Sequence, residues 1–171
     1  MLSLFSMNNH TILYAGGIIN GGFPQEDIYD LISTALYNNG IDIVDKLACT
    51  YNEVMDSMKQ DPVAVVLTTK YLFDNKEQRP IPEEAFKKTL DVIELANEKS
   101  IPAFYILSTN LYGRPPYNTI ARQFGAPPDW YPAKAEAKGA ICLESHGNNW
   151  EDIALPIIKT IIKHLKPDSS K

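Results

Sequence analysis

"PVAVVLTTKYLFDN", residues 62–75, is the stretch that decides the fold. Five apolar residues, Val63 to Leu67, follow one another without a break, and Thr68 and Thr69 come directly after them. A half-buried strand would alternate apolar and polar residues, so a short unbroken run indicates a strand covered on both faces, as in a parallel sheet. We therefore expect polar side chains at the carboxyl end of a buried parallel strand.

Other short apolar or β-rich segments predict four more strands, and helical patterns alternate with them. The predicted strands are "TILYAGG" (11–17), "IDIV" (41–44), "IPAFYIL" (101–107) and "GAICL" (139–143), and the predicted helices run from Pro24 to Gly40, from the capping box "TYNE" (50–53) to Met58, from Pro82 to about Lys99, and from "NW" (149–150) to Leu165. Pro156 leaves open whether the last helix begins at the proline. This alternation indicates an α/β fold, a single doubly wound five-stranded parallel sheet in the flavodoxin-like order 2-1-3-4-5, with helices on both faces.

The composition is typical of one globular domain. Of the 171 residues, 44% are hydrophobic and 22% are charged, which is ordinary for a chain with a single core. We expect an N-terminal extension over 1–10, the folded domain over 11–166 and a C-terminal tail over 167–171. The net charge of -5 and the scattered basic residues argue against nucleic acid or an anionic membrane as a partner.

The cysteines and histidines predict no metal site. Cys49 and Cys142 lie far apart without C-x-x-C spacing, and the three histidines form no ligand cluster. The N-terminal "MLSLFSMNNH" lacks the basic start and the apolar run of a signal peptide, and no stretch approaches the roughly 18 apolar residues of a membrane span. Two stray cysteines fit a reducing compartment, so we expect a cytoplasmic protein.

The sheet order predicts where a ligand binds. In doubly wound sheets, ligands lie outside the carboxyl ends of the strands where the winding reverses, which here is between "AGG" (15–17) at the end of strand 1 and Thr68 and Thr69 at the end of strand 3. "GGIINGG" matches neither the dinucleotide fingerprint nor a P-loop. Its glycines either let the backbone approach a ligand or form a flexible connection.

Candidate catalytic groups near this crevice are few. No G-x-S-x-G elbow, H-E-x-x-H motif or cysteine beside a histidine is present. The remaining pair is Glu83–Glu84, at the start of the helix after strand 3, and the helix dipole alone would explain two carboxylates there. Residues 108–138 form a long irregular segment rich in proline and aromatic residues, which is typical of a functional loop.

A family resemblance adds to this pattern. "DIYDLISTALYNNGIDIVDKL", "TYNEVMDSMKQDPVAVVLTTKYLFDN", "IPEEAFKKTLDVIELANEKSIPAFYIL" and "GAICLESHGNNWEDIALPIIKTIIKHL" together resemble a Toll/interleukin-1 receptor (TIR) domain over nearly the whole chain. Thr68 stands where the family usually has serine, and Tyr71 matches its tyrosine. The chain departs from the family in "RPIP" before the glutamates, in a longer loop after Tyr71 and in "YAGG" at the end of strand 1.

The resemblance implies an enzyme that cleaves the nicotinamide–ribose bond of NAD⁺, giving ADP-ribose or a cyclic form of it, in immune or cell-death signalling. It implies Glu84 as the catalytic carboxylate, with Glu83 as the second candidate, and NAD⁺ as substrate with no bound cofactor. We expect the substrate to contact Ala15, Gly16 and Gly17 at the end of strand 1 and Thr68, Thr69 and Tyr71 after strand 3. Either Tyr112 or Trp130 would stack on a base from the long loop, and Trp130 equally fits an aromatic packed on the domain surface. A homo-oligomer or TIR–TIR assembly is the implied partner arrangement.

Three alternatives stay open at this point. Many TIR domains are adaptors that only self-associate, and the departures around Glu84 suit an inactive site. "ILYAGG" also resembles the opening of nucleoside 2-deoxyribosyltransferases, although the "G-T-x-x-E" context of their glutamate is absent. A flavodoxin-like electron carrier fits the size and acidity, but no Ser/Thr-rich phosphate loop follows strand 1.

Overall fold

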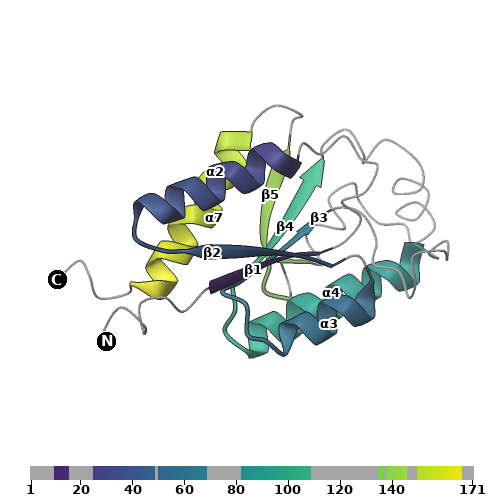
Figure 1. The fold of residues 1–171 in the computed structure, drawn as a ribbon. Coiled ribbons are helices and arrows are strands. Elements are labelled where there is room, and N and C mark those ends of the chain that lie inside the picture. The colour runs from purple at the N-terminus through teal and green to yellow at the C-terminus, as the bar shows by residue number, and fades with distance from the viewer. Residues whose placement is uncertain are drawn as a thin grey trace.

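The computed structural model describes residues 10–15, 25–48, 50–68, 82–108, 135–136, 138–145 and 150–166. Strands and helices alternate along this part of the chain (Figure 1). They are β1 (His10–Ala15), α2 (Gln25–Asn38), β2 (Ile43–Ala48), α3 (Tyr51–Met58), β3 (Ala64–Thr68), α4 (Pro82–Glu98), β4 (Ala103–Ser108), β5 (Ile141–Ser145) and α7 (Trp150–Leu165).

The five strands form one sheet in the order β2-β1-β3-β4-β5, and every neighbouring pair is parallel. Figure 1 shows α2 and α7 on one face of this sheet and α3 and α4 on the other. Helices on both faces follow from the right-handed crossovers that parallel strands require. The predicted α/β class and the predicted strand order are therefore confirmed.

Each central strand contributes to two apolar clusters, one on each face of the sheet. In β1, Leu13 and Ala15 face α3 and α4, whereas Ile12 and Tyr14 face α2 and α7, and all four are at most 2% exposed. In β3, Val65 and Leu67 alternate with Val66 in the same way. The unbroken apolar run 63–67 thus reflects burial on both faces, as the sequence predicted.

Local signals fix the helix ends. The Thr50 hydroxyl accepts a hydrogen bond from the Glu53 amide at 3.1 Å, which caps α3 at its first turn. Gly40, with φ +78°, follows α2, and the amides of Gly40 and Ile41 donate to the carbonyls of Tyr37 and Leu36. This is the Schellman pattern that ends helices at glycine, so the predicted stop at Gly40 is confirmed.

The structure corrects the predicted second strand and confirms the start of the last helix at "NW" (149–150). The second strand does not run over 41–44 but from Ile43 to Ala48, and it passes through Asp45 and Lys46. These charges are tolerated because β2 pairs on one side only, at the edge of the sheet. The last helix begins at Trp150 and continues through Pro156, so it does not begin at the proline. The short helix predicted around "YNTIARQFG" lies outside the described residues.

Membrane-spanning helices and metal-ligand clusters are both absent from the described residues. No helix in the described part of the chain combines the length and the apolar character needed to cross a membrane. Among the same residues, no group of three or more His, Cys, Asp or Glu side chains is arranged to hold a metal ion.

Candidate functional site

The carboxyl ends of β1 and β3 lie side by side. Tyr14 is in register with Val66 and Ala15 with Leu67, and the side chains of all four are at most 2% exposed. The chain passes from β1 outward to β2 and then returns to β3 on the other side of β1. The winding therefore reverses between β1 and β3, and this is the edge where doubly wound sheets bind ligands.

Helix α4 begins at Pro82 and carries Glu83 and Glu84 in its first turn. Its later residues Val92, Ile93 and Ala96 are buried against the sheet beside β1, β3 and β4. In Figure 1, α4 runs opposite to the strands, with its first turn on the side of the strand arrowheads. The amino end of α4 and the carboxyl edge of the sheet thus lie on the same side of the molecule.

The remaining predicted site residues divide into two groups. Ala15 ends β1, and Thr68 is the last residue of β3. The structure describes Thr68, Glu83 and Glu84 by their backbone alone, and their side chains lie outside the described part. Gly16, Gly17, Thr69, Tyr71, Tyr112 and Trp130 lie wholly outside the described residues. The strand ends meet as predicted, and the contributions of the loop residues stay predictions.

A buried tyrosine near the end of β1 was not foreseen. Tyr14 is 2% exposed, and its ring meets that of Tyr29 from α2, with the centroids 4.3 Å apart and the planes inclined by 54°. Burial, with smaller contributions from Asp45 and Tyr29, raises the pKa of Tyr14 far above its usual value. The phenol therefore stays protonated. Its oxygen is buried and has no hydrogen-bond partner among the described residues, which costs about 1–3 kcal/mol for a buried polar group.

Asp45 and Ser33 extend this polar region toward the sheet edge. The Ser33 side chain hydrogen-bonds to Asp45 and favours its ionised form, but burial of the carboxylate is the larger effect and raises the pKa of Asp45, as does the charge of Asp30. Tyr14, Tyr29, Ser33 and Asp45 form the α2-side polar cluster, on the face opposite α4. Tyr14 gave one sequence signal, because it is a polar-tipped residue in an otherwise apolar strand ending.

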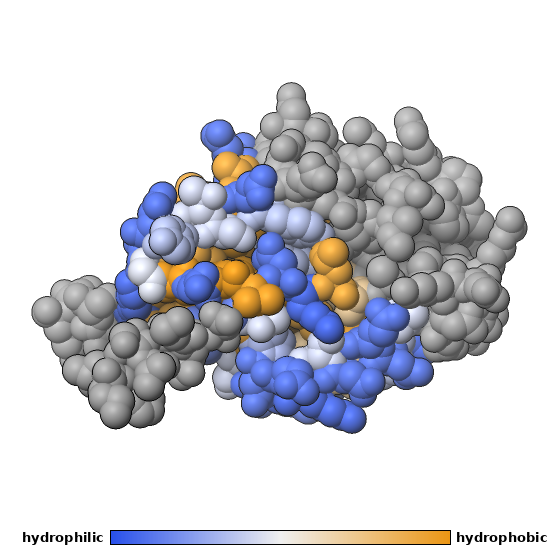
Figure 2. Space-filling model, in the orientation of Figure 1, coloured by the Kyte–Doolittle hydropathy of each residue, from blue (hydrophilic) through white to orange (hydrophobic). Residues whose placement is uncertain are grey.

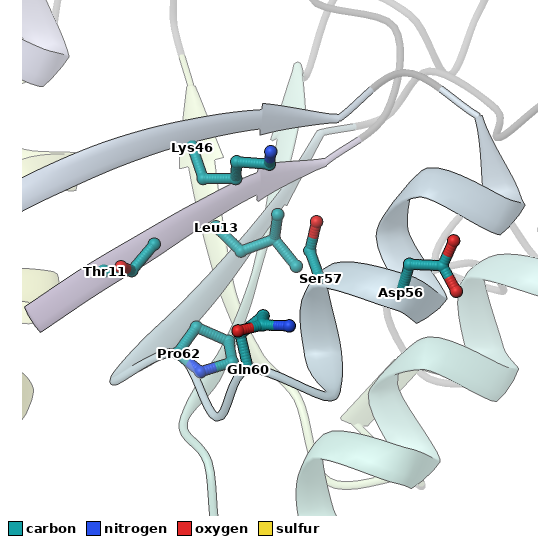
Figure 3. A pocket seen from close by; sticks show the side chains of 7 residues that line it. All are labelled: Thr11, Leu13, Lys46, Asp56, Ser57, Gln60 and Pro62. Carbon is teal, nitrogen blue, oxygen red and sulfur yellow. The ribbon is translucent and has the colours of Figure 1, made fainter.

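A pocket of about 400 Å³ lies on the other face of the sheet, between β1, β2 and the last turn of α3 (Figure 3). In Figure 3 the side chains of Ser57 and Leu13 point toward one another, and Asp56 points away along α3. The residues that line it are Thr11, Leu13, Lys46, Asp56, Ser57, Gln60 and Pro62. Thr11 is the second residue of β1 and Pro62 lies two residues before β3, so the pocket is near the amino edge of the sheet. It is therefore a different place from the predicted crevice.

The Cys142 thiol is held in its protonated form, which disfavours a role as a nucleophile. The thiol is half-buried in β5. Burial, aided by the charge of Glu136, raises the pKa of Cys142 to about 12. Because only the thiolate is an effective nucleophile, this cysteine is inert at neutral pH.

Comparisons with known proteins add no family. No protein-family model matches the chain, and no curated protein matches it. The chain is similar to the lysine decarboxylase LdcF of Francisella novicida (17% identity, TM-score 0.47, 90% of this chain and 17% of that one), so it spans a small part of that enzyme. It is similar to an oxidoreductase from Corynebacterium diphtheriae, with 11% identity and a TM-score of 0.49 over 91% of this chain and 97% of that one. It is also similar to the psychrotrophic esterase EstA from Pseudoalteromonas sp., with 13% identity and a TM-score of 0.47 over 95% of this chain and 100% of that one. None of these three is described as a TIR domain, and similarities this distant carry no functional inference.

Proposed function

We propose that the protein is a TIR-like enzyme that cleaves the nicotinamide–ribose bond of NAD⁺, with Glu84 as the catalytic carboxylate and Glu83 as the second candidate. The products would be nicotinamide and ADP-ribose or a cyclic ADP-ribose, released as an immune or cell-death signal. NAD⁺ is the substrate in this proposal, and no resident cofactor takes part.

One observation carries the proposal. The buried ends of β1 and β3 meet at Ala15 and Leu67, and the first turn of α4, with Glu83 and Glu84, lies on the same side of the sheet. A ligand bound at the switch point would therefore lie on the same side of the molecule as the turn of α4 that carries Glu83 and Glu84. The resemblance in sequence assigns the catalytic glutamate to this same turn.

The chemistry needs only one carboxylate. Breaking the bond between nicotinamide and ribose builds positive charge on the ribose, and a fixed negative charge at that face stabilises the oxocarbenium-like transition state. Nicotinamide leaves as a neutral molecule, so no general acid has to protonate it. The positive end of the α4 dipole favours the ionised form of a glutamate in the first turn, which is the form that this role requires.

The test is chromatography of NAD⁺ incubated with the purified protein at high concentration. We expect nicotinamide release by the wild type and a loss of about 100-fold or more in Glu84→Gln. Glu98→Gln is the matched control, because it changes an exposed glutamate at the opposite end of the same helix. The second product distinguishes hydrolysis from cyclisation.

Other outcomes redirect the assignment. Loss of activity in Glu83→Gln alone would transfer the catalytic role to Glu83. Intact NAD⁺ with every variant, including the wild type at concentrations that favour assembly, would contradict the proposal. Nucleosides would then test the deoxyribosyltransferase alternative, and self-association without turnover would support the adaptor.

A further inference from the structure

The outer edge of β2 has unused backbone hydrogen-bonding groups. The His10 amide donates to the Asp42 carbonyl at 3.2 Å, so Asp42, Val44 and Lys46 direct their backbone groups toward β1. Alternate residues of a strand direct these groups to opposite sides, so those of Ile43, Asp45 and Leu47 point away from the sheet. Within the described ranges, no strand pairs with this side of β2.

The side chains along this edge are also exposed. Val44 is 46% and Leu47 is 52% exposed, although both are strand residues. Figure 2 shows apolar and hydrophilic surface next to each other across the middle of the face where Figure 1 places β2. An exposed strand edge with apolar side chains is a template for pairing with another strand.

We propose that a second copy of this chain pairs with this edge, β2 against β2 in antiparallel orientation, about a two-fold axis at Val44. The pairing would extend the five-stranded sheet across two subunits. It is independent of the proposed activity, because it uses neither the switch point nor α4.

The charges on β2 select this register. A two-fold axis perpendicular to an antiparallel pair places even-numbered residues opposite even-numbered ones and odd-numbered residues opposite odd-numbered ones. The side chains of each opposed pair then lie on the same face of the sheet. Three registers keep most of the extended segment 42–48 paired, with the axis at Val44, at Asp45 or at Lys46. The axis at Asp45 places the two copies of this aspartate directly opposite each other, and the axis at Lys46 does the same with two lysines. Like charges in these positions are destabilising.

The register centred on Val44 instead pairs opposite charges. Asp42 then lies opposite Lys46 of the partner subunit, and Lys46 opposite Asp42 of the partner subunit, with Val44 against its own copy. Asp42 and Lys46 are both exposed, so neither has to leave the core to make this contact. Charge complementarity thus favours a second copy of this chain as the occupant. The competing explanation is that these charges keep the edge unpaired, as charged residues do on many edge strands.

Cysteine cross-linking tests the register. In a background with Cys49 and Cys142 replaced by serine, Val44→Cys, Asp45→Cys and Lys46→Cys each place one thiol at one of the three candidate axes. Opposed residues in a non-hydrogen-bonded antiparallel pair have Cα atoms about 4.5 Å apart, within the range for a disulfide. We expect Val44→Cys to form a disulfide-linked dimer at least tenfold faster than Asp45→Cys or Lys46→Cys. Equal rates for the three variants, or fastest linking at Asp45 or Lys46, would overturn the register.

Charge exchange tests the partner, with sedimentation equilibrium as the measurement and circular dichroism as the check that each variant is folded. We expect Asp42→Lys and Lys46→Asp each to weaken dimerisation at least fivefold, because each change places like charges opposite one another twice. The double variant restores both pairs and should recover the wild-type dissociation constant. A wild type that stays monomeric at every concentration reached overturns the proposal, and so does a dimer that is unaffected by the single changes.

Discussion

Strands β3 and β2 show how the position in a sheet decides the environment of similar residues. Leu67 in β3 is 1% exposed, whereas Leu47 in β2 is 52% exposed. Strand β3 has a paired neighbour on each side and helices on both faces, whereas β2 pairs only with β1 among the described strands. The interior strand is thus fixed by apolar burial, and the edge strand is left available for charges and for a partner.

The largest expected effect tests this difference directly. Leu67→Ala removes a fully buried side chain and should lower the free energy of unfolding by about 2–5 kcal/mol. Leu47→Ala removes a half-exposed one and should change it by less than about 0.5 kcal/mol. Urea denaturation of both variants, at a concentration where the protein is monomeric, measures the two values. Effects of similar size would contradict the assignment of β2 as an open edge.

The loops that lead into the two edge strands give the next effect. Gly40 and Gly139 precede β2 and β5 with φ +78° and +107°, so alanine is strained at both. At Gly139 the added Cβ would also lie 2.7 Å from Oδ1 and 3.1 Å from Cβ of Asn97, whereas at Gly40 its nearest contact is at 3.9 Å. We expect Gly40→Ala to cost about 1 kcal/mol and Gly139→Ala to cost more. Thermal unfolding compares them, and the reverse order would contradict the contact with Asn97.

Two buried hydroxyl groups, one after edge strand β2 and one in interior strand β1, should differ in their effect on stability. The Thr50 hydroxyl, after β2, caps α3, and its loss in Thr50→Ala should cost about 1 kcal/mol. The Tyr14 hydroxyl, in interior strand β1, is buried and has no hydrogen-bond partner in the part of the chain that the structure describes. Tyr14→Phe should therefore leave the stability unchanged or raise it slightly. A loss as large as that of Thr50→Ala would show that the Tyr14 hydroxyl has a partner in solution.

The smallest effect concerns pH. Because burial raises the pKa of Asp45 above its ordinary 3.8, the folded protein holds this proton more tightly than the unfolded chain. The protonated Asp45 therefore contributes to the stability of the fold below pH 3.8. This contribution is lost as the pH rises from 3.8 through the pKa of Asp45 in the folded protein. We expect Asp45→Asn to remove this loss, so that it gains stability relative to the wild type as the pH rises. Denaturation between pH 3 and 7 tests this, with Asp91→Asn, an exposed aspartate on α4, as the control.

Only a part of the candidate site could be predicted from the sequence. The meeting of the β1 and β3 ends could be predicted, because the alternation of short apolar runs with helical patterns indicates a doubly wound sheet and the flavodoxin-like order is one of its common strand orders. The α2-side polar cluster could not, since Tyr14, Ser33 and Asp45 come from three elements and no periodicity joins them. The pocket beside Lys46 was missed for a related reason, because β2 was expected to end at Val44.

The sequence by itself determined the α/β class with parallel strands, the capped start of α3 at Thr50 and the stop of α2 at Gly40. These depend on local patterns and on chirality, which act within one element or one crossover. The tertiary structure alone decided that β2 continues through Asp45 and Lys46 and that the Tyr14 hydroxyl is buried, with no hydrogen-bond partner within the described ranges. Both depend on which surfaces meet across the sheet, because burial and pairing are set by neighbours distant in the chain.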